Sequence, residues 1–236
     1  MKTVLLLLAT CLSFLAFSQQ DVKVKKKDRK KDIELVTTEG TVVLRLSDST
    51  PEHRDNFIRL VKSHYLDSIL FHRVINGFMI QAGDPVSIRA AARQPLGNGG
   101  PGYTLPAEIN TSLFHKKGAL AAARKGDAEN PEKRSSGSQF YIVHGKKFTD
   151  QQLDSIEVVR LQGRKIAPEH REYYRTVGGT PQLDGNYTVF GEVVSGQDVV
   201  DKIATTQVST GPDANRPLQD VRILSVHLIK RIPLSP

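Results

Sequence analysis

The sequence contains one cysteine and no tryptophan among its 236 residues. The cysteine, Cys11, lies in an N-terminal apolar run, so the rest of the chain can form neither a disulfide nor a cysteine-based metal site. The seven histidines form no H-E-x-x-H pattern, and G-x-S-x-G is absent, so neither a zinc hydrolase nor a serine hydrolase is indicated. We therefore expect an activity that needs no metal, no cofactor and no nucleophile.

The N-terminal apolar run is too short to cross a membrane, which takes roughly 20 apolar residues. Residues 4–17 form a run of 14 residues that follows Lys2 and ends in the small-x-small pattern Ala16-Phe17-Ser18. This pattern predicts a cleaved signal peptide over residues 1–18, and a mature chain without a thiol suits an oxidising compartment. An uncleaved anchor and a lipoprotein processed at the lipobox-like Leu8-Ala9-Thr10-Cys11 are the alternatives.

Most of the positive charge lies close to this segment. The formal net charge is +8, and residues 21–32 (DVKVKKKDRKKD) hold seven basic and three acidic residues, so without this segment and Lys2 only +3 remains on residues 33–236. A nucleic-acid surface interleaves basic residues with aromatic ones, and this segment has no aromatic residue. We predict a basic disordered linker over residues 19–32 and no nucleic-acid partner. An electrostatic contact of residues 23–31 with an anionic membrane stays open, without stable membrane insertion.

Beyond residue 32 the chain shows the alternation typical of strands more often than helical spacing. The expected strands are residues 33–38, 41–46, 69–75, 78–82, 119–123, 139–144, 188–194 and 221–229. Helices are expected from Pro51, from Thr149 to Arg160 with a capping box to Gln152, and over residues 198–204 capped by Ser195. Many short strands without regular strand-helix alternation predict a mostly β, antiparallel barrel or sandwich.

A glycine-rich loop at residues 97–102 satisfies G-x-G-x-x-G by letter. A dinucleotide site needs a strand before the motif and a helix that opens from it, whereas here Pro95 precedes it and Pro101 interrupts it. We interpret it as a surface loop.

Three other stretches combine polar amides, aromatic residues and turns. They are FHRVINGFMIQAGD at residues 71–84, GSQFYIV at residues 137–143 and LDGNYTVFG at residues 183–191. In the first, Asn76-Gly77 suits a turn with positive φ between two strands. On the residues alone, Arg73 could simply point to water.

Together and in this order, these stretches resemble the cyclophilin family of peptidyl-prolyl cis-trans isomerases over about residues 33–229. The resemblance implies an eight-stranded antiparallel cyclophilin-like barrel capped by helices. The isomerase domain would span residues 33–236, with insertions at about 125–136 and, as an added helical segment, 146–182. These insertions are either solvated decorations or a lid or docking surface for a client.

The resemblance also implies roles for individual residues. Arg73 would be the catalytic arginine and Gln81 the residue that orients it. The substrate-binding residues would be Phe78, Met79, Gly97, Ala123, Gln139, Tyr141, Leu183 and Tyr187. The sequence departs from the family pattern at Tyr141, where phenylalanine is usual, at Tyr187, where histidine is common, and at Arg124, where asparagine is familiar.

The implied chemistry fits these residue types. Rotation about an X-Pro bond meets a barrier of about 18–20 kcal/mol because the nitrogen shares its lone pair with the carbonyl. The twisted transition state frees that lone pair, and a guanidinium can then donate a hydrogen bond to it. We expect a monomeric isomerase acting on proline-containing clients, and the similarity to bacterial secreted members suggests the periplasm. A noncatalytic proline-peptide-binding or chaperone module is the alternative.

Overall fold

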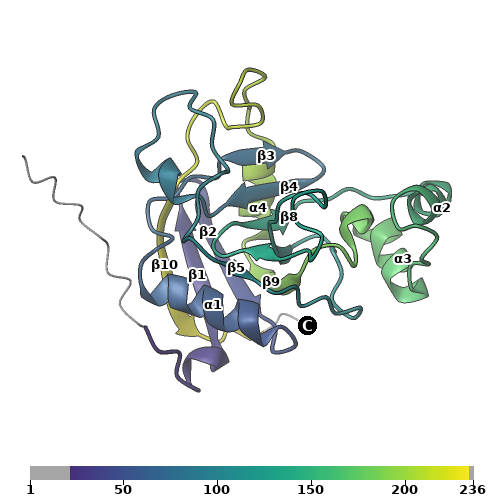
Figure 1. Ribbon diagram of the computed structural model, residues 1–236, viewed down its shortest axis with the longest axis horizontal. Helices are drawn as coiled ribbons and strands as arrows, with labels where there is room; N and C mark the ends of the chain where they lie inside the picture. The colour runs from purple at the N-terminus through teal and green to yellow at the C-terminus, as the bar shows by residue number, and fades with distance from the viewer. Residues whose placement is uncertain (1–21, 234–236) are drawn as a thin grey trace, which may run out of the picture.

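The computed structural model describes residues 22–233, which form one curled antiparallel sheet of eight strands with helices at its ends (Figure 1). The strand order is β10-β1-β2-β9-β6-β8-β4-β3. The strands are β1 (Lys31–Thr37), β2 (Gly40–Leu46), β3 (Arg73–Ile75), β4 (Met79–Ala82), β6 (Ala119–Ala122), β8 (Phe140–Val143), β9 (Val189–Ser195) and β10 (Ile223–Lys230). A separate pair joins β5 (Thr104–Leu105) to β7 (Ser135–Ser136).

Backbone hydrogen bonds join the start of β10, at one edge of this sheet, to the segment that precedes β3 at the other edge. The amide of Ser68 donates to the Ile223 carbonyl, and the amide of Ile223 donates to the Ile69 carbonyl, each at 2.8 Å. The amide of Phe71 donates to the Val221 carbonyl at 2.9 Å. The eight-stranded antiparallel fold that the resemblance implies is confirmed, in the form of a curled sheet or half-barrel.

The four α-helices of the described residues are α1 (Pro51–Lys62), α2 (Asp150–Val159), α3 (Pro168–Thr176) and α4 (Gln197–Ala204), and three short 3-10 helices are η1 (Asp28–Lys30), η2 (Pro85–Arg89) and η3 (Pro181–Leu183). Phe57 of α1 packs against Phe140 and Phe190 of the sheet, with ring centroids 5.3 and 5.4 Å apart. This contact closes one end of the main apolar core, because it fills the space between α1 and two strands. Within the described residues no helix combines the length and apolar character needed to cross a bilayer.

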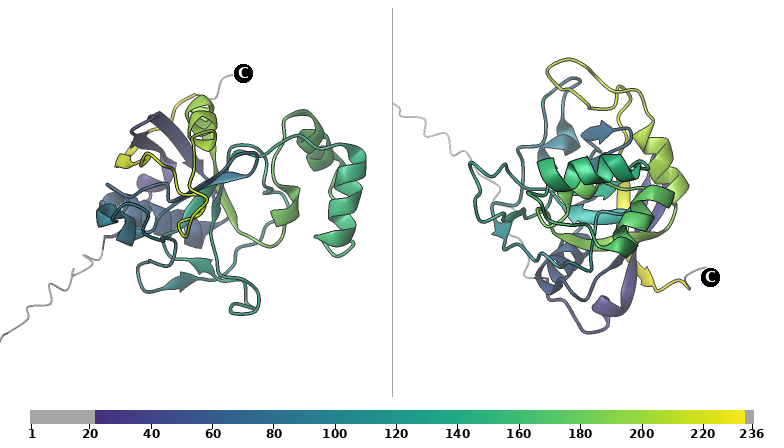
Figure 2. Two further views of the ribbon diagram at one scale, coloured as in Figure 1. Left: turned by 90° about the horizontal axis from the view of Figure 1, so that it is seen from above. Right: turned by 90° about the vertical axis from the view of Figure 1, so that its right-hand side faces the viewer.

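The segment 146–182 is helical, as the sequence predicts. The capping box between Thr149 and Gln152 is present at the start of α2, and Pro168 begins α3. Both helices lie side by side and project from the curled sheet (Figure 1, Figure 2). They have a small apolar cluster of their own, separate from the main core, with Leu153, Leu161, Ile166 and Tyr174.

The prediction of a disordered linker up to residue 32 is wrong for residues 22–32. Asp28 in η1 is buried and accepts from Lys62 Nζ at 2.9 Å, while Asp32 at the start of β1 is buried and pairs with Arg45 at 2.8 Å. A basic segment was expected to stay solvated, but these two carboxylates meet cations of α1 and β2 that lie far along the chain. The rest of the linker and the predicted signal peptide at residues 1–18 lie outside the described residues.

The predicted cap of the last helix is also wrong. Ser195 ends β9, and the residue that precedes α4 is Gly196, with φ of 83° and no side-chain cap. A Cβ on Gly196 would lie 2.3 Å from the Thr41 carbonyl oxygen. The strand therefore turns into α4 through a left-handed glycine that passes close to β2.

Candidate active site

Arg73 and Gln81 lie opposite each other on the β3-β4 hairpin. The strands pair in register at these two residues, and Gly77 in the connecting turn has φ of 72°, as the Asn76-Gly77 pair predicts. Directly opposed side chains of an antiparallel pair share one face. Accordingly, Arg73 Nη1 donates a hydrogen bond to Gln81 Oε1 at 3.2 Å.

A relay of amides continues from Gln81 to the glycine-rich loop. Gln81 Nε2 donates to Gln139 Oε1 at 3.0 Å, and Gln139 Nε2 donates to the carbonyls of Gly97 and Gly99, each at 2.8 Å. These bonds use both ends of each amide, which fixes which end points at Arg73. The orientation of Arg73 is thus tied to β4, to Gln139 directly before β8 and to the loop at residues 97–102.

Asp84 holds that loop from the other side, a role that the sequence analysis missed. Its Oδ2 accepts from the amides of Gly97 at 2.6 Å and Gly99 at 3.3 Å, and the carboxylate is buried. Gly97 has φ of 103°, a conformation that other residues rarely adopt. The only sequence signal was the position of Asp84 as the last residue of the stretch 71–84.

An apolar cluster lies next to the Arg73 guanidinium. Met79, Ala123 and Tyr141 are buried in it, and the partly buried residues packed against it include Phe78, Leu183 and Tyr187. Arg73 Nη1 is 4.0 Å from the sulfur of Met79, and Arg73 Cζ is 5.9 Å from the centroid of the Phe78 ring. The ten residues singled out from the sequence therefore gather around one cluster and one relay.

The charge of Arg73 has no carboxylate partner within salt-bridge distance among the described residues; its polar contacts are the amide of Gln81 and the sulfur of Met79. Burial lowers the pKa of Arg73, yet a guanidinium keeps its proton at neutral pH. A partly buried cation without a counter-ion is available to interact with an electron-rich atom of a ligand. No group of three histidine, cysteine, aspartate or glutamate side chains suited to a metal occurs in residues 22–233.

A second polar chain, also missed from the sequence, begins at the hydroxyl of Tyr141. That hydroxyl is 2.9 Å from Nε2 of His115, and His115 Nδ1 is 2.8 Å from Oδ1 of Asp184. The hydroxyl of Tyr174, on α3, donates to the other carboxylate oxygen at 2.6 Å. Burial raises the pKa of both tyrosines well above its usual value, so both hydroxyls keep their protons.

These hydrogen bonds link the added helices to the apolar cluster. An ionised carboxylate only accepts hydrogen bonds, so Nδ1 of His115 is assigned as the donor to Asp184, and Nε2 of a neutral ring then accepts from Tyr141. The extra hydroxyl at Tyr141, a departure from the family pattern, therefore has a partner.

Two further positions have their polar groups already occupied. The amide of Ala123 donates to the Gln139 carbonyl at 3.0 Å and its carbonyl accepts from Ser136 at 2.8 Å, so a peptide could use only the second lone pair of that carbonyl. Arg124 lies over the ring of Tyr187, with 4.5 Å from Cζ to the centroid, and pairs with Asp127 at 2.6 Å.

Comparisons with known proteins give a consistent result. The family described as cyclophilin type peptidyl-prolyl cis-trans isomerase/CLD matches residues 32–228. A Staphylococcus saprophyticus protein named as a peptidyl-prolyl cis-trans isomerase is 34% identical over 198 residues, covering 82% of this chain and 89% of that protein. A protein of the same name from Staphylococcus aureus strain USA300 is 33% identical over 207 residues, covering 86% and 95%.

Solved structures agree on the fold. A crystal structure of a Cryptosporidium parvum cyclophilin type peptidyl-prolyl cis-trans isomerase matches with a TM-score of 0.60 at 21% identity, covering 86% of this chain and 99% of that one. The same protein in the presence of the dipeptide Ala-Pro matches with a TM-score of 0.59 at 20% identity, covering 85% and 100%.

Proposed function

This chain belongs to the cyclophilin-type peptidyl-prolyl cis-trans isomerases, and on that basis we propose that Arg73 is the residue through which it accelerates rotation about X-Pro bonds. The observation that carries the proposal is the position of the Arg73 guanidinium. Gln81 holds it beside the cluster of Phe78 and Met79, and no carboxylate of residues 22–233 neutralises it.

In this mechanism the proline ring packs on the apolar cluster while Arg73 faces the prolyl nitrogen. The planar isomers offer no lone pair at that nitrogen, whereas the twisted transition state does. A hydrogen bond from the guanidinium therefore stabilises the transition state more than either isomer, which is the condition for catalysis. No bond to the substrate is made or broken except the hydrogen bond itself.

The apolar cluster contributes as well as the arginine. A 10⁵-fold acceleration needs about 7 kcal/mol, and a hydrogen bond in water has a net value of about 1 kcal/mol. Packing of the ring on Phe78, Met79, Leu183 and the ring of Tyr141 excludes water and strengthens the field of the guanidinium. The cluster therefore binds the proline ring, and the rate enhancement comes from the Arg73 hydrogen bond, which forms where the ring has excluded water.

The test is the rate of cis-trans exchange in a proline-containing model peptide, measured by NMR with wild type, Arg73→Ala and Arg73→Lys. We expect kcat/KM to fall about 100-fold or more in both variants, because a lysine lacks the planar fork that Gln81 orients. Arg59→Ala is the matched control, since Arg59 is exposed on α1. Thermal melting checks that the variants fold.

Equal rates for wild type and Arg73→Ala would overturn the assignment. If wild type itself showed no acceleration but bound the peptide, the noncatalytic proline-peptide-binding module would be the better description.

We also propose that the clients are exported proteins and that the mature chain works in the periplasm. The support is the pattern of residues 1–18 and the absence of cysteine from the chain beyond them. Mass spectrometry of the protein from cell fractions is the test, and we expect a periplasmic protein that begins at Gln19. A chain that retains Met1 in the cytoplasmic fraction would contradict the proposal.

A further inference from the structure

A cleft of about 590 Å³ adjoins the apolar cluster described above. Leu183 and Tyr187 belong to both, since they pack against the cluster and line the cleft. Most of the other lining residues come from the two insertions, with Gly126, Asp127 and Lys133 from one and Arg160, Leu161, Gln162, Arg164 and Gln182 from the other. Its volume is in the range of ligand-binding clefts.

The cleft carries an excess of positive charge. Its charged residues are Arg124, Lys133, Arg160 and Arg164 against Asp127. Arg124 is neutralised by Asp127 at 2.6 Å, so three cations remain. Lys133 donates to the neutral Asn186 Oδ1 at 2.7 Å and Arg164 to the Asp184 carbonyl, and within residues 22–233 neither these two nor Arg160 has a carboxylate within salt-bridge distance.

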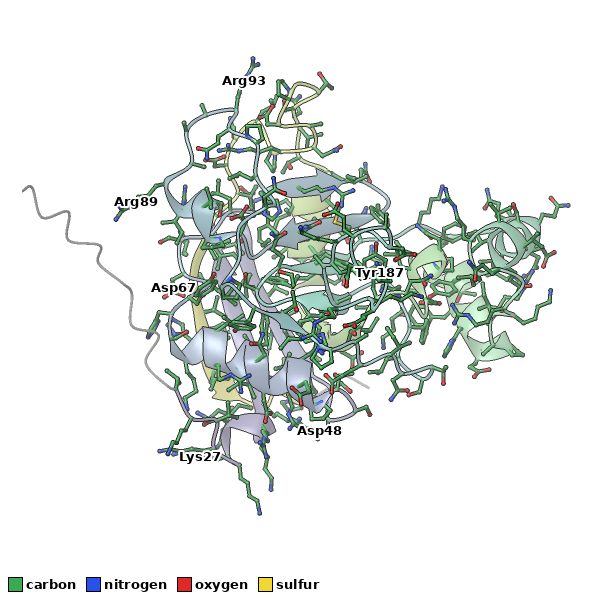
Figure 3. All side chains as sticks on the ribbon, viewed as in Figure 1. Lys27, Asp48, Asp67, Arg89, Arg93 and Tyr187 are labelled. Carbon is green, nitrogen blue, oxygen red and sulfur yellow. The ribbon has the colours of Figure 1, made fainter. Side chains whose placement is uncertain are left out.

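The position of these cations relative to the cluster matters for a bound peptide. In Figure 3 Tyr187 lies between the sheet and the projecting helices, and residues of both insertions line the same cleft as Tyr187. An extended chain advances about 3.3 Å per residue, so residues within about three positions of a proline held on the cluster lie within about 10 Å of it. Because Leu183 and Tyr187 belong to both the cluster and the cleft, a peptide that leaves the cluster across these two residues comes close to the cleft on one side of its proline.

Resting on the proposed function, we infer that this enzyme selects prolines with an acidic residue within about three positions on one side, and that the two insertions form this specificity site. Unpaired cations in a cleft beside the reacting bond favour a client carboxylate and disfavour a client lysine. The insertions are then docking surfaces and not solvated decorations.

The experiment compares peptides that differ only by Glu, Gln or Lys at each of the three positions on either side of one proline. With wild type at low ionic strength, we expect kcat/KM for the best-placed Glu to exceed that of its Gln counterpart about fivefold, which matches two exposed ion pairs. The ratio should approach one in 0.5 M salt, because exposed charges are then screened.

The decisive variant is the double substitution Lys133→Glu and Arg160→Glu. It should remove or reverse the preference for Glu while leaving kcat/KM for the all-Gln peptide within about twofold. The matched control is Lys27→Glu with Arg89→Glu, which makes the same change in net charge at exposed positions far from Tyr187 (Figure 3).

The outcomes separate this inference from the function on which it rests. If the Gln peptide is isomerised but Glu gives no gain at any position, or if the preference survives in the Lys133→Glu, Arg160→Glu protein, the specificity site is refuted and the isomerase assignment stands. Loss of the preference in the control variant as well would also refute it, because the effect would then belong to net charge. If wild type isomerises no peptide, the function itself fails.

Discussion

The two sides of the apolar cluster are held in different ways. On one side, Arg73 is fixed by Gln81, Gln139 and the glycine-rich loop, all of which belong to the curled sheet or to loops packed on it. On the other side, Tyr141 is fixed through His115 and Asp184 to a hydroxyl on α3, outside the sheet.

This difference separates the proposed catalytic residue from the proposed specificity site. The position of Arg73 depends only on the curled sheet and the loops packed on it, so we expect changes in the added helices to leave the position of Arg73 unchanged. The opposite wall depends on the insertion, which is attached both by the hydrogen bond from Tyr174 to Asp184 and by the ring of Phe114 packed on α3. Four predictions test this division, from the largest expected effect to the smallest.

Removing Asp184 should be the most costly change. Asp184→Ala leaves the His115 ring, the His115 amide and the Tyr174 hydroxyl without their acceptor. We expect the free energy of unfolding to fall by about 3 kcal/mol, because buried donors lose their partner. Urea denaturation measures it. The control Asp154→Ala removes only an exposed pair with Arg171 and should cost less than about 1 kcal/mol. An equal loss of stability in the two variants would show that the hydrogen bonds to Asp184 stabilise the fold no more than an exposed ion pair does.

On the Arg73 side, His72 should make stability depend on pH. Burial lowers the pKa of His72 from 6.5 to about 4, against the opposing charge of Asp84. The contribution of the neutral His72 ring to the free energy of unfolding is therefore complete above pH 6.5. It is lost as the pH falls toward 4, because over that range the unfolded chain binds a proton at His72 and the folded chain does not. Between pH 7.5 and pH 5 we expect the loss from this group to be about 2 kcal/mol. Denaturation of wild type and His72→Gln at both pH values checks it, and parallel pH dependences would refute it.

The amide relay predicts a smaller effect, measured on catalysis. Gln81→Leu removes the acceptor that orients Arg73 while keeping the size of the side chain similar. We expect kcat/KM to fall about tenfold, as for loss of one hydrogen bond to a charged group. KM should change little, because the apolar cluster is intact. A variant with unchanged kcat would mean that β3 alone positions the guanidinium.

Tyr174→Phe should have the smallest effect. It removes a single hydrogen bond to Asp184 and keeps the ring that packs in the insertion. We expect a loss of about 1 kcal/mol in the free energy of unfolding, with kcat for a Gln-flanked peptide within twofold of wild type. A large loss of kcat would contradict the separation of the catalytic residue from the added helices, because it would show that α3 takes part in catalysis.

Several features of the fold and the site could be predicted from local sequence. Alternation located the strands, the Asn76-Gly77 turn set Arg73 opposite Gln81, and the pair Thr149 and Gln152 marked the start of α2. Each depends on residues only a few positions apart, where backbone geometry follows from side-chain type.

The rest was decided by tertiary structure. Asp28 and Lys62 are 34 residues apart, His115 and Tyr141 are 26 apart, and His115 and Asp184 are 69 apart. No local sequence pattern predicts contacts between residues so far apart in the chain. The sequence by itself determined the strands and the hairpin that sets Arg73 opposite Gln81. Packing of distant segments decided the rest: the buried start of β1, the hydrogen bonds that link Tyr141 to Tyr174, and the basic cleft. The physical reason is that a polar or charged group gains a partner, or is left without one, only once folding has removed it from water.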